Sequence, residues 1–149
     1  MIYHGIDIVE VARVRLAAER WGQRFLRRVF TPGELIDCGV SEGAPRYQSL
    51  ASRWAAKEAA AKALGVGLSG LGAEKSEQGP IGRLRFHELE VAREPDGRPA
   101  LRLHGRAAAL AERQGIAELA LSLSHTGEHA IASVVGLGVG RRPGDDGVE

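Results

Sequence analysis

The segment from residue 46 to residue 64 constrains the fold of this 149-residue chain more than any other. It is rich in alanine, leucine and lysine and contains no glycine or proline, which predicts one uninterrupted helix. Gly65 follows at the position where a left-handed glycine commonly ends a helix. Lys57 is expected to be solvated. The residues expected to face the core are Leu50, Trp54, Ala55, Ala59 and Leu64.

Apolar alternation and turn residues predict several strands around this helix. The predicted strands cover residues 2–9, 84–91, 100–103, 116–124 and 129–135, with a turn at 94–99. Further helices are predicted at 10–28, from an N-cap at Thr31 to about Cys38, and at 106–114. The expected fold is α+β, a single domain over residues 1–137 with an antiparallel sheet packed against helices. Residues 70–82 are expected to form a flexible insertion, and residues 138–149 a frayed tail.

Charge and cysteine content narrow the classes of function. The net charge of +1 argues against a general nucleic-acid or membrane surface, and no apolar run approaches the length of a membrane span. Residues 1–30 nevertheless carry six arginines against three acidic residues, a local basic patch suited to an acidic partner. The only cysteine, Cys38, excludes an internal disulfide and is expected to be a plain thiol; the default location is the cytoplasm.

Asp7 is the first candidate functional residue, because it is a carboxylate within an apolar strand. It shares one strand face with Tyr3, Gly5 and Val9, whereas Ile2, His4, Ile6 and Ile8 occupy the other. This pattern suits a partly buried position, where a carboxylate must be paired or bound to a metal. The alternative is an exposed acid or one paired with a nearby arginine.

Glu58 and Lys62 form the second candidate group, because residues four apart share a helix face. A simple surface ion pair is the alternative interpretation. Arg53 lies about 140° away around the same helix and need not serve the same site. Two carboxylates from distant segments with cations beside them suggest a Mg²⁺–phosphate site. Gly65 and Gly67 follow a helix rather than precede one, so a helix stop explains them better than a phosphate loop.

Five segments in combination resemble the holo-acyl-carrier-protein synthase family of 4′-phosphopantetheinyl transferases. They occur in the family's order and extend to about Val135. The segments are Gly5-Ile-Asp-Ile-Val-Glu10 with Arg13, Phe30-Thr-Pro-Gly-Glu34, Arg53-Trp-Ala-Ala-Lys-Glu-Ala59 with Lys62, Gly65-Val-Gly67, and Ser124-His-Thr126.

The resemblance implies transfer of phosphopantetheine from coenzyme A to a serine of an apo acyl carrier protein, leaving 3′,5′-ADP. Asp7 and Glu58 would hold Mg²⁺, and Lys62 would contact phosphate. The general base stays open between Glu58 and a Mg²⁺-bound water. The implied coenzyme A contacts come from Arg53, Arg46, Gly65, Gly67, His125 and Thr126.

The resemblance also implies partners. Acyl carrier proteins are acidic, so Arg13, Arg20 and Arg24 would dock the carrier. The family is expected to form homotrimers with sites shared between subunits. Two other functions stay open: another coenzyme A-dependent transferase with the same Mg²⁺ site, or a non-catalytic module that binds acidic proteins. A serine hydrolase built on His125 is disfavoured, because the chain has no nucleophile elbow.

Overall fold

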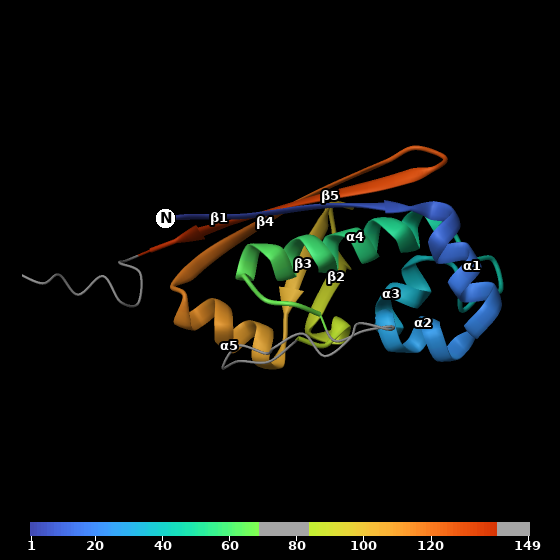
Figure 1. Cartoon of the computed structure of the whole chain (residues 1–149), viewed down its shortest axis with the longest axis horizontal. Helices are drawn as coiled ribbons and strands as arrows, with labels where there is room; N and C mark the ends of the chain where they lie inside the picture. Colours follow the sequence, from blue (N-terminus) through green and yellow to red (C-terminus); the bar gives the residue numbers. More distant parts are fainter. Residues whose placement is uncertain (69–83, 140–149) are drawn as a thin grey trace, which may run out of the picture.

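A three-stranded antiparallel sheet forms one side of the molecule (Figure 1). The computed structural model describes residues 1–68 and 84–139. The strand order is β1 (Ile2–Glu10), β5 (His129–Gly138) and β4 (Ile116–His125), so the first strand of the chain pairs with the last. In this register Gly5 lies opposite Val134, and Asp7 opposite Ala132. The α+β fold class and these three predicted strands are confirmed.

The predicted central helix is confirmed as α4 (Tyr47–Leu64), which lies along the inner face of the sheet against β1 and β5 (Figure 1). It ends at Gly65, whose φ of 74° is the left-handed conformation expected there. The side chains of Leu50, Trp54, Ala55, Ala59 and Leu64 are all buried, as predicted.

The helix predicted at 10–28 is wrong in one respect, because it is two helices. The structure contains α1 (Val11–Trp21) and α2 (Gln23–Val29), separated at Gly22, whose φ is 56° and ψ is −139°. A residue without a Cβ adopts this conformation without steric cost, so the chain turns here. The turn lets Phe25 of α2 enter the core, where its ring lies 5.6 Å from that of Trp54.

The next helix, α3 (Pro32–Asp37), begins at Thr31 as predicted. The Thr31 hydroxyl accepts a bond from the Glu34 N–H, and the Glu34 carboxylate accepts one from the Thr31 N–H.

The strand predicted at 84–91 begins too early. Residues Phe86–Glu88 form a 3₁₀ turn, η1, and the strand β2 covers Leu89–Arg93. The turn is closed by the Glu88 carboxylate, which accepts a 2.7 Å bond from the backbone N–H of Arg85. Strand β2 then pairs with β3 (Pro99–Leu103), as the turn at 94–99 predicts, and α5 (Gly105–Arg113) follows.

Lys57 is buried, so the prediction that it is solvated is wrong. Its ammonium donates to Glu34 Oε1 at 2.7 Å and to the carbonyls of Phe86 and Leu89 at 3.0 and 2.8 Å. The second Glu34 oxygen accepts from the Val91 N–H at 3.0 Å. Every hydrogen of the ammonium has an acceptor, which offsets the free-energy cost of removing the charge from water. The ion pair thereby joins α3, η1 and β2 to α4.

The outer face of the sheet carries exposed aliphatic side chains. Ile2, Ile6 and Ile8 of β1 are 72%, 54% and 60% exposed, and Ile131, Val135 and Leu137 of β5 lie on the same face. All the helices lie on the other side of the sheet (Figure 1). No helix within the described ranges is long and apolar enough to cross a membrane.

The last strand extends further than predicted. β5 continues to Gly138, and the Val139 N–H bonds to the Gly115 carbonyl at 2.9 Å, so the tail does not begin at residue 138. The insertion expected at about 70–82 lies outside the described residues, as does the tail from residue 140 onward.

Candidate active site

A glycine brings the first strand against the central helix. A Cβ on Gly5 would lie 1.9 Å from the Ala59 carbonyl oxygen and 2.7 Å from the Ala63 backbone nitrogen, both in α4. Only glycine fits at this distance, since neither backbone atom can move without displacing the helix. Asp7 lies two residues further along β1 and therefore on the same face, toward α4.

Asp7 and Lys62 meet at this strand–helix contact. The Lys62 ammonium donates to Asp7 Oδ1 at 2.9 Å and to the Ile6 carbonyl at 3.0 Å. The Asp7 side chain is 18% exposed and that of Lys62 is 55% exposed. The carboxylate is thus partly buried, as its strand pattern predicts, and a cation occupies one of its oxygens.

Glu58 lies one turn before Lys62 on the same face of α4. Its Oε1 accepts a 3.2 Å bond from the Trp54 indole N–H, which fixes the half-buried carboxylate on the helix surface. The guanidinium of Arg13, in α1, lies 5.1 Å from the centre of the Trp54 ring. A row of side chains thus runs along α4 from Trp54 through Glu58 to Lys62, with Asp7 at one end and Arg13 at the other.

The chemistry of Asp7 and Glu58 fits a hard divalent cation. Their donor atoms are carboxylate oxygens, which Mg²⁺ prefers, and Mg²⁺ commonly takes one or two carboxylates and completes its shell with water and phosphate oxygens. Within residues 1–68 and 84–139 there is no group of three or more metal-ligating side chains. Two carboxylates leave the rest of a Mg²⁺ shell to water and phosphate oxygens, so they suit a metal that is shared with a phosphorylated substrate.

Arg53 belongs to a different group. Its side chain is 6% exposed and reaches toward Asp37, with 3.9 Å between Nη2 and Oδ2. Its Nη1 donates to the Ser49 carbonyl at 3.4 Å, and its buried Nε has no hydrogen-bond partner within the part of the chain that the structure describes. Arg53 and His125 line one cleft of about 230 Å³ together with Arg93 and Pro99 of the β2–β3 hairpin. Two arginines and a histidine along one cleft favour an anionic group from outside the chain.

The structure therefore divides the predicted site residues into two groups. Asp7, Glu58 and Lys62 form one, and Arg53 with His125 forms the other.

The other predicted nucleotide contacts have local roles in this chain. The Thr126 hydroxyl accepts from the Glu128 and His129 N–H groups, which closes the β4–β5 turn beside His125. The Arg46 guanidinium donates to the Asp37 carbonyl. Gly65 ends α4, and the Gly67 carbonyl accepts a bond from the Leu84 N–H at 3.0 Å.

The arginines expected to contact a partner are exposed, although they lie on two helices rather than one. Arg13 and Arg20 belong to α1, and Arg24 belongs to α2. The Arg20 guanidinium lies 4.8 Å from the centre of the Trp21 ring, and Trp21 is itself half exposed. A basic surface with a large aromatic side chain is thus available beside the row on α4.

Comparison with known proteins identifies the family. Residues 4–134 match the family model described as the 4′-phosphopantetheinyl transferase superfamily. The chain belongs to this superfamily. The match includes Asp7, Glu58, Lys62 and His125, but it assigns no role to any of them.

Relatives within the superfamily are similar over nearly their whole length. A protein of Chloroflexus aurantiacus named holo-[acyl-carrier-protein] synthase is 59% identical over 135 residues, which cover 91% of this chain and 97% of that protein. A protein of the same name from Herpetosiphon aurantiacus is 50% identical over 138 residues, covering 93% of this chain and all of that one.

Solved structures of other proteins, two of them with coenzyme A bound, share the fold. The Helicobacter pylori holo-[acyl-carrier-protein] synthase in complex with coenzyme A has a TM-score of 0.71 and 31% identity, covering 92% of this chain and 100% of that chain. The ACPS–CoA complex from Chronobacterium ammoniagenes has a TM-score of 0.73 and 34% identity, covering 93% and 98%.

Proposed function

We propose that this superfamily member transfers the 4′-phosphopantetheine group from coenzyme A to a serine hydroxyl of an apo acyl carrier protein, leaving 3′,5′-ADP. The observation that carries the proposal is the contact between Asp7 and Lys62 where β1 approaches α4 through Gly5, with Glu58 one turn before Lys62 on the same helix face. A diphosphate substrate must be positioned and its negative charge neutralised. This surface offers one ammonium and two carboxylates whose oxygens suit a divalent metal ion. The relatives named for this activity, and the relatives solved with coenzyme A, support it.

Asp7 and Glu58 are the residues that would hold Mg²⁺. When bound, the ion would neutralise negative charge on the pyrophosphate of coenzyme A. Lys62 contributes a second cation. Its pairing with Asp7 is solvent-accessible and so worth about 1 kcal/mol or less, which leaves the ammonium able to exchange Asp7 for a phosphate oxygen. Glu58 is the protein's own candidate to accept the serine proton.

The division of the site residues supports a shared site. We propose a homotrimer in which Arg46, Arg53, His125 and Thr126 of one subunit complete a coenzyme A site with Asp7, Glu58 and Lys62 of its neighbour, and Gly65 and Gly67 border the nucleotide. The exposed isoleucines on the outer face of β1 supply an apolar surface for a second copy.

Arg13, Arg20 and Arg24 are proposed to dock the acidic carrier protein. All three are exposed, and Arg13 lies at the end of the row of side chains that contains Glu58. Electrostatic docking of this kind weakens as ionic strength rises. The Michaelis constant for the carrier should therefore increase with salt, whereas that for coenzyme A should change less.

A thermal-shift titration with coenzyme A, with and without Mg²⁺, tests the metal residues. The expected result is a Mg²⁺-dependent stabilisation by coenzyme A that Asp7→Ala abolishes, while Glu112→Ala, at an exposed position on α5, retains it. A shift that is unchanged in Asp7→Ala would contradict the metal assignment.

A mixing experiment tests the shared site. Asp7→Ala and His125→Ala chains are each expected to be inactive alone and to regain activity when they are co-assembled, because some sites then combine two unmodified halves. No recovery in mixed oligomers would contradict the sharing.

A further inference from the structure

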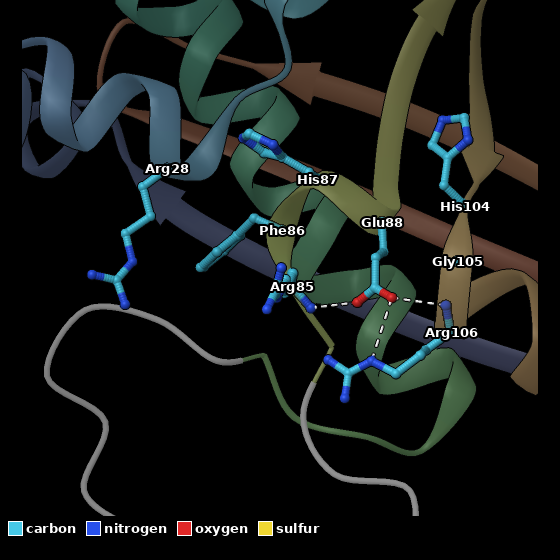
Figure 2. A pocket seen from close by; sticks show the side chains of 8 residues that line it. All are labelled: Arg28, Arg85, Phe86, His87, Glu88, His104, Gly105 and Arg106. Atoms are coloured by element: carbon cyan, nitrogen blue, oxygen red, sulfur yellow. Dashed lines mark hydrogen bonds and ion pairs between the residues drawn. The ribbon is translucent and has the colours of Figure 1, made fainter.

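A second cavity lies away from both groups of site residues. It has a volume of about 620 Å³, within the range typical of small-molecule sites, and it opens between α2, η1 and the start of α5 (Figure 2). None of its lining residues belongs to the row on α4 or to the cleft of Arg53 and His125. The lining residues are Arg28, Arg85, Phe86, His87, Glu88, His104, Gly105 and Arg106.

Three arginines from distant parts of the chain line this cavity. Figure 2 shows Arg28 of α2 and Arg106 of α5 on either side of Arg85, which precedes η1. Three positive charges around one hollow give it a positive potential that attracts an anion. Each guanidinium presents a planar fork of N–H donors that matches phosphate oxygens in pairs.

Among the described residues that line the cavity, Glu88 is the one with an acidic side chain, and it already accepts hydrogen bonds. The Glu88 carboxylate accepts 2.7 Å bonds from the backbone N–H groups of Arg85 and Arg106, and it lies 3.5 Å from the Arg106 Nε. Burial alone would raise the pKa of Glu88, but these hydrogen bonds lower it overall, so the carboxylate is charged and held in place. It anchors Arg106 and caps the start of α5, and it makes no side-chain pair with Arg28 or Arg85.

Arg28 and Arg85 are therefore the groups available to a ligand. Both side chains are exposed, and among the described residues neither guanidinium takes part in an ion pair or a side-chain hydrogen bond. Phe86, buried below them, gives the cavity an apolar base; His87 and His104 also line it, but their rings point away from the arginines, and the His104 Nε2 pairs with Glu90 Oε1 at 3.1 Å (Figure 2). A concave wall of this composition fits a compact polyanion better than it fits the flat surface of a protein.

We infer that this cavity binds a small molecule with two adjacent phosphate groups, for which inorganic pyrophosphate is the minimal form. One phosphate would bridge Arg28 and Arg85, and the second would contact Arg85 and Arg106. This site goes beyond the proposed transfer reaction and does not depend on it.

Calorimetric titration of the full chain with pyrophosphate, with EDTA present to exclude metal chelates, tests the inference. Arg85→Gln and Arg28→Gln are expected each to weaken binding about tenfold, the effect of losing a charge-assisted pair of bonds. Arg113→Gln removes the same charge from an exposed position on α5 outside the cavity and should change the affinity less than about twofold. Arg85→Gln keeps its backbone bond to Glu88, so its melting temperature should match that of the unmodified chain.

Lys62→Gln separates this cavity from the candidate active site. It should leave the pyrophosphate affinity unchanged, and Arg85→Gln should leave transfer of phosphopantetheine unchanged. The inference is overturned if pyrophosphate does not bind below about 10 mM. It is also overturned if Arg113→Gln weakens binding as much as Arg85→Gln, or if only Lys62→Gln weakens it. Binding of an acidic carrier protein at Arg85 without binding of pyrophosphate would likewise overturn it.

Discussion

Replacing Lys57 with methionine tests whether the buried ion pair holds the core of this fold together. The Lys57 ammonium is fully buried and donates three bonds of 2.7 to 3.0 Å, to Glu34, Phe86 and Leu89. Methionine fills a similar volume but leaves the buried Glu34 charge without a counter-ion and two carbonyls without donors. Breaking a buried pair in this way costs about 3–5 kcal/mol, so the melting temperature should fall by roughly 6–20 °C.

The matched control is Lys62→Met, on the same helix. Its ion pair with Asp7 is accessible to solvent, so its loss should cost about 1 kcal/mol or less. Urea denaturation of the three proteins, with slopes that agree, gives the differences in unfolding free energy. Adding Glu34→Gln to Lys57→Met should cost less than the sum of the single changes by about 1–3 kcal/mol, because the two groups interact directly. A cost for Lys57→Met below about 1 kcal/mol, or equal to that of Lys62→Met, would refute the reasoning.

Three further predictions concern other parts of the fold. Gly5→Ala should destabilise the protein by about 1–3 kcal/mol in urea denaturation, because the new methyl group forces β1 away from the Ala59 carbonyl. The same change should also reduce metal-dependent coenzyme A binding. Unaltered stability would contradict the close contact between β1 and α4. Burial raises the pKa of the Cys38 thiol from 9.0 to about 11. A thiol reagent at pH 8 should therefore label Cys38 only when the protein unfolds. Rapid labelling of the folded protein would contradict the burial of this thiol. Because the folded pKa of Glu88 lies below 4.5, its stabilising contribution is present above pH 4.5 and is lost as the pH falls through the folded value. Glu88→Gln should therefore be less stable than the unmodified chain at pH 7, by about 1–3 kcal/mol, and the difference measured by thermal unfolding should shrink below pH 4.5.

Much of the fold follows from local patterns in the sequence. The uninterrupted composition of residues 46–64 predicts α4, and the alternation in residues 2–9 places Asp7 on the face toward that helix. These patterns are reliable because they depend on near neighbours along the chain. The sequence does not predict the helix break at Gly22, because the apolar periodicity continues through it and the cost of one glycine is small beside the burial of Phe25.

The burial of Lys57 cannot be predicted from local sequence patterns alone. Lys57 lies seven residues after Leu50 and three after Trp54, which is the helical spacing of the core face, and this was a signal that it points inward. Its charge favours the opposite interpretation. Only the position of Glu34, 23 residues earlier in the chain, makes burial possible, and no local rule predicts that contact.

The candidate site shows the same limit. The sequence predicts that Asp7, Glu58 and Lys62 belong to one site, and the structure places Asp7 beside Lys62 because Gly5 lets β1 approach α4. That Arg53 shares a cleft with His125 depends on how the β2–β3 hairpin packs against α4, which is a long-range arrangement. The roles of these residues toward metal and coenzyme A stay predictions.

The intact mass of a purified apo acyl carrier protein, incubated with this protein, coenzyme A and Mg²⁺, tests the central claim most directly. The carrier is expected to gain the mass of one phosphopantetheine group, and EDTA or Glu58→Ala is expected to prevent the gain. Glu112→Ala, at an exposed position on α5, should leave the reaction intact. No gain in mass across several apo carriers, with folded protein that binds coenzyme A, would contradict the proposed function; a gain that persists in Glu58→Ala with EDTA would contradict the metal site.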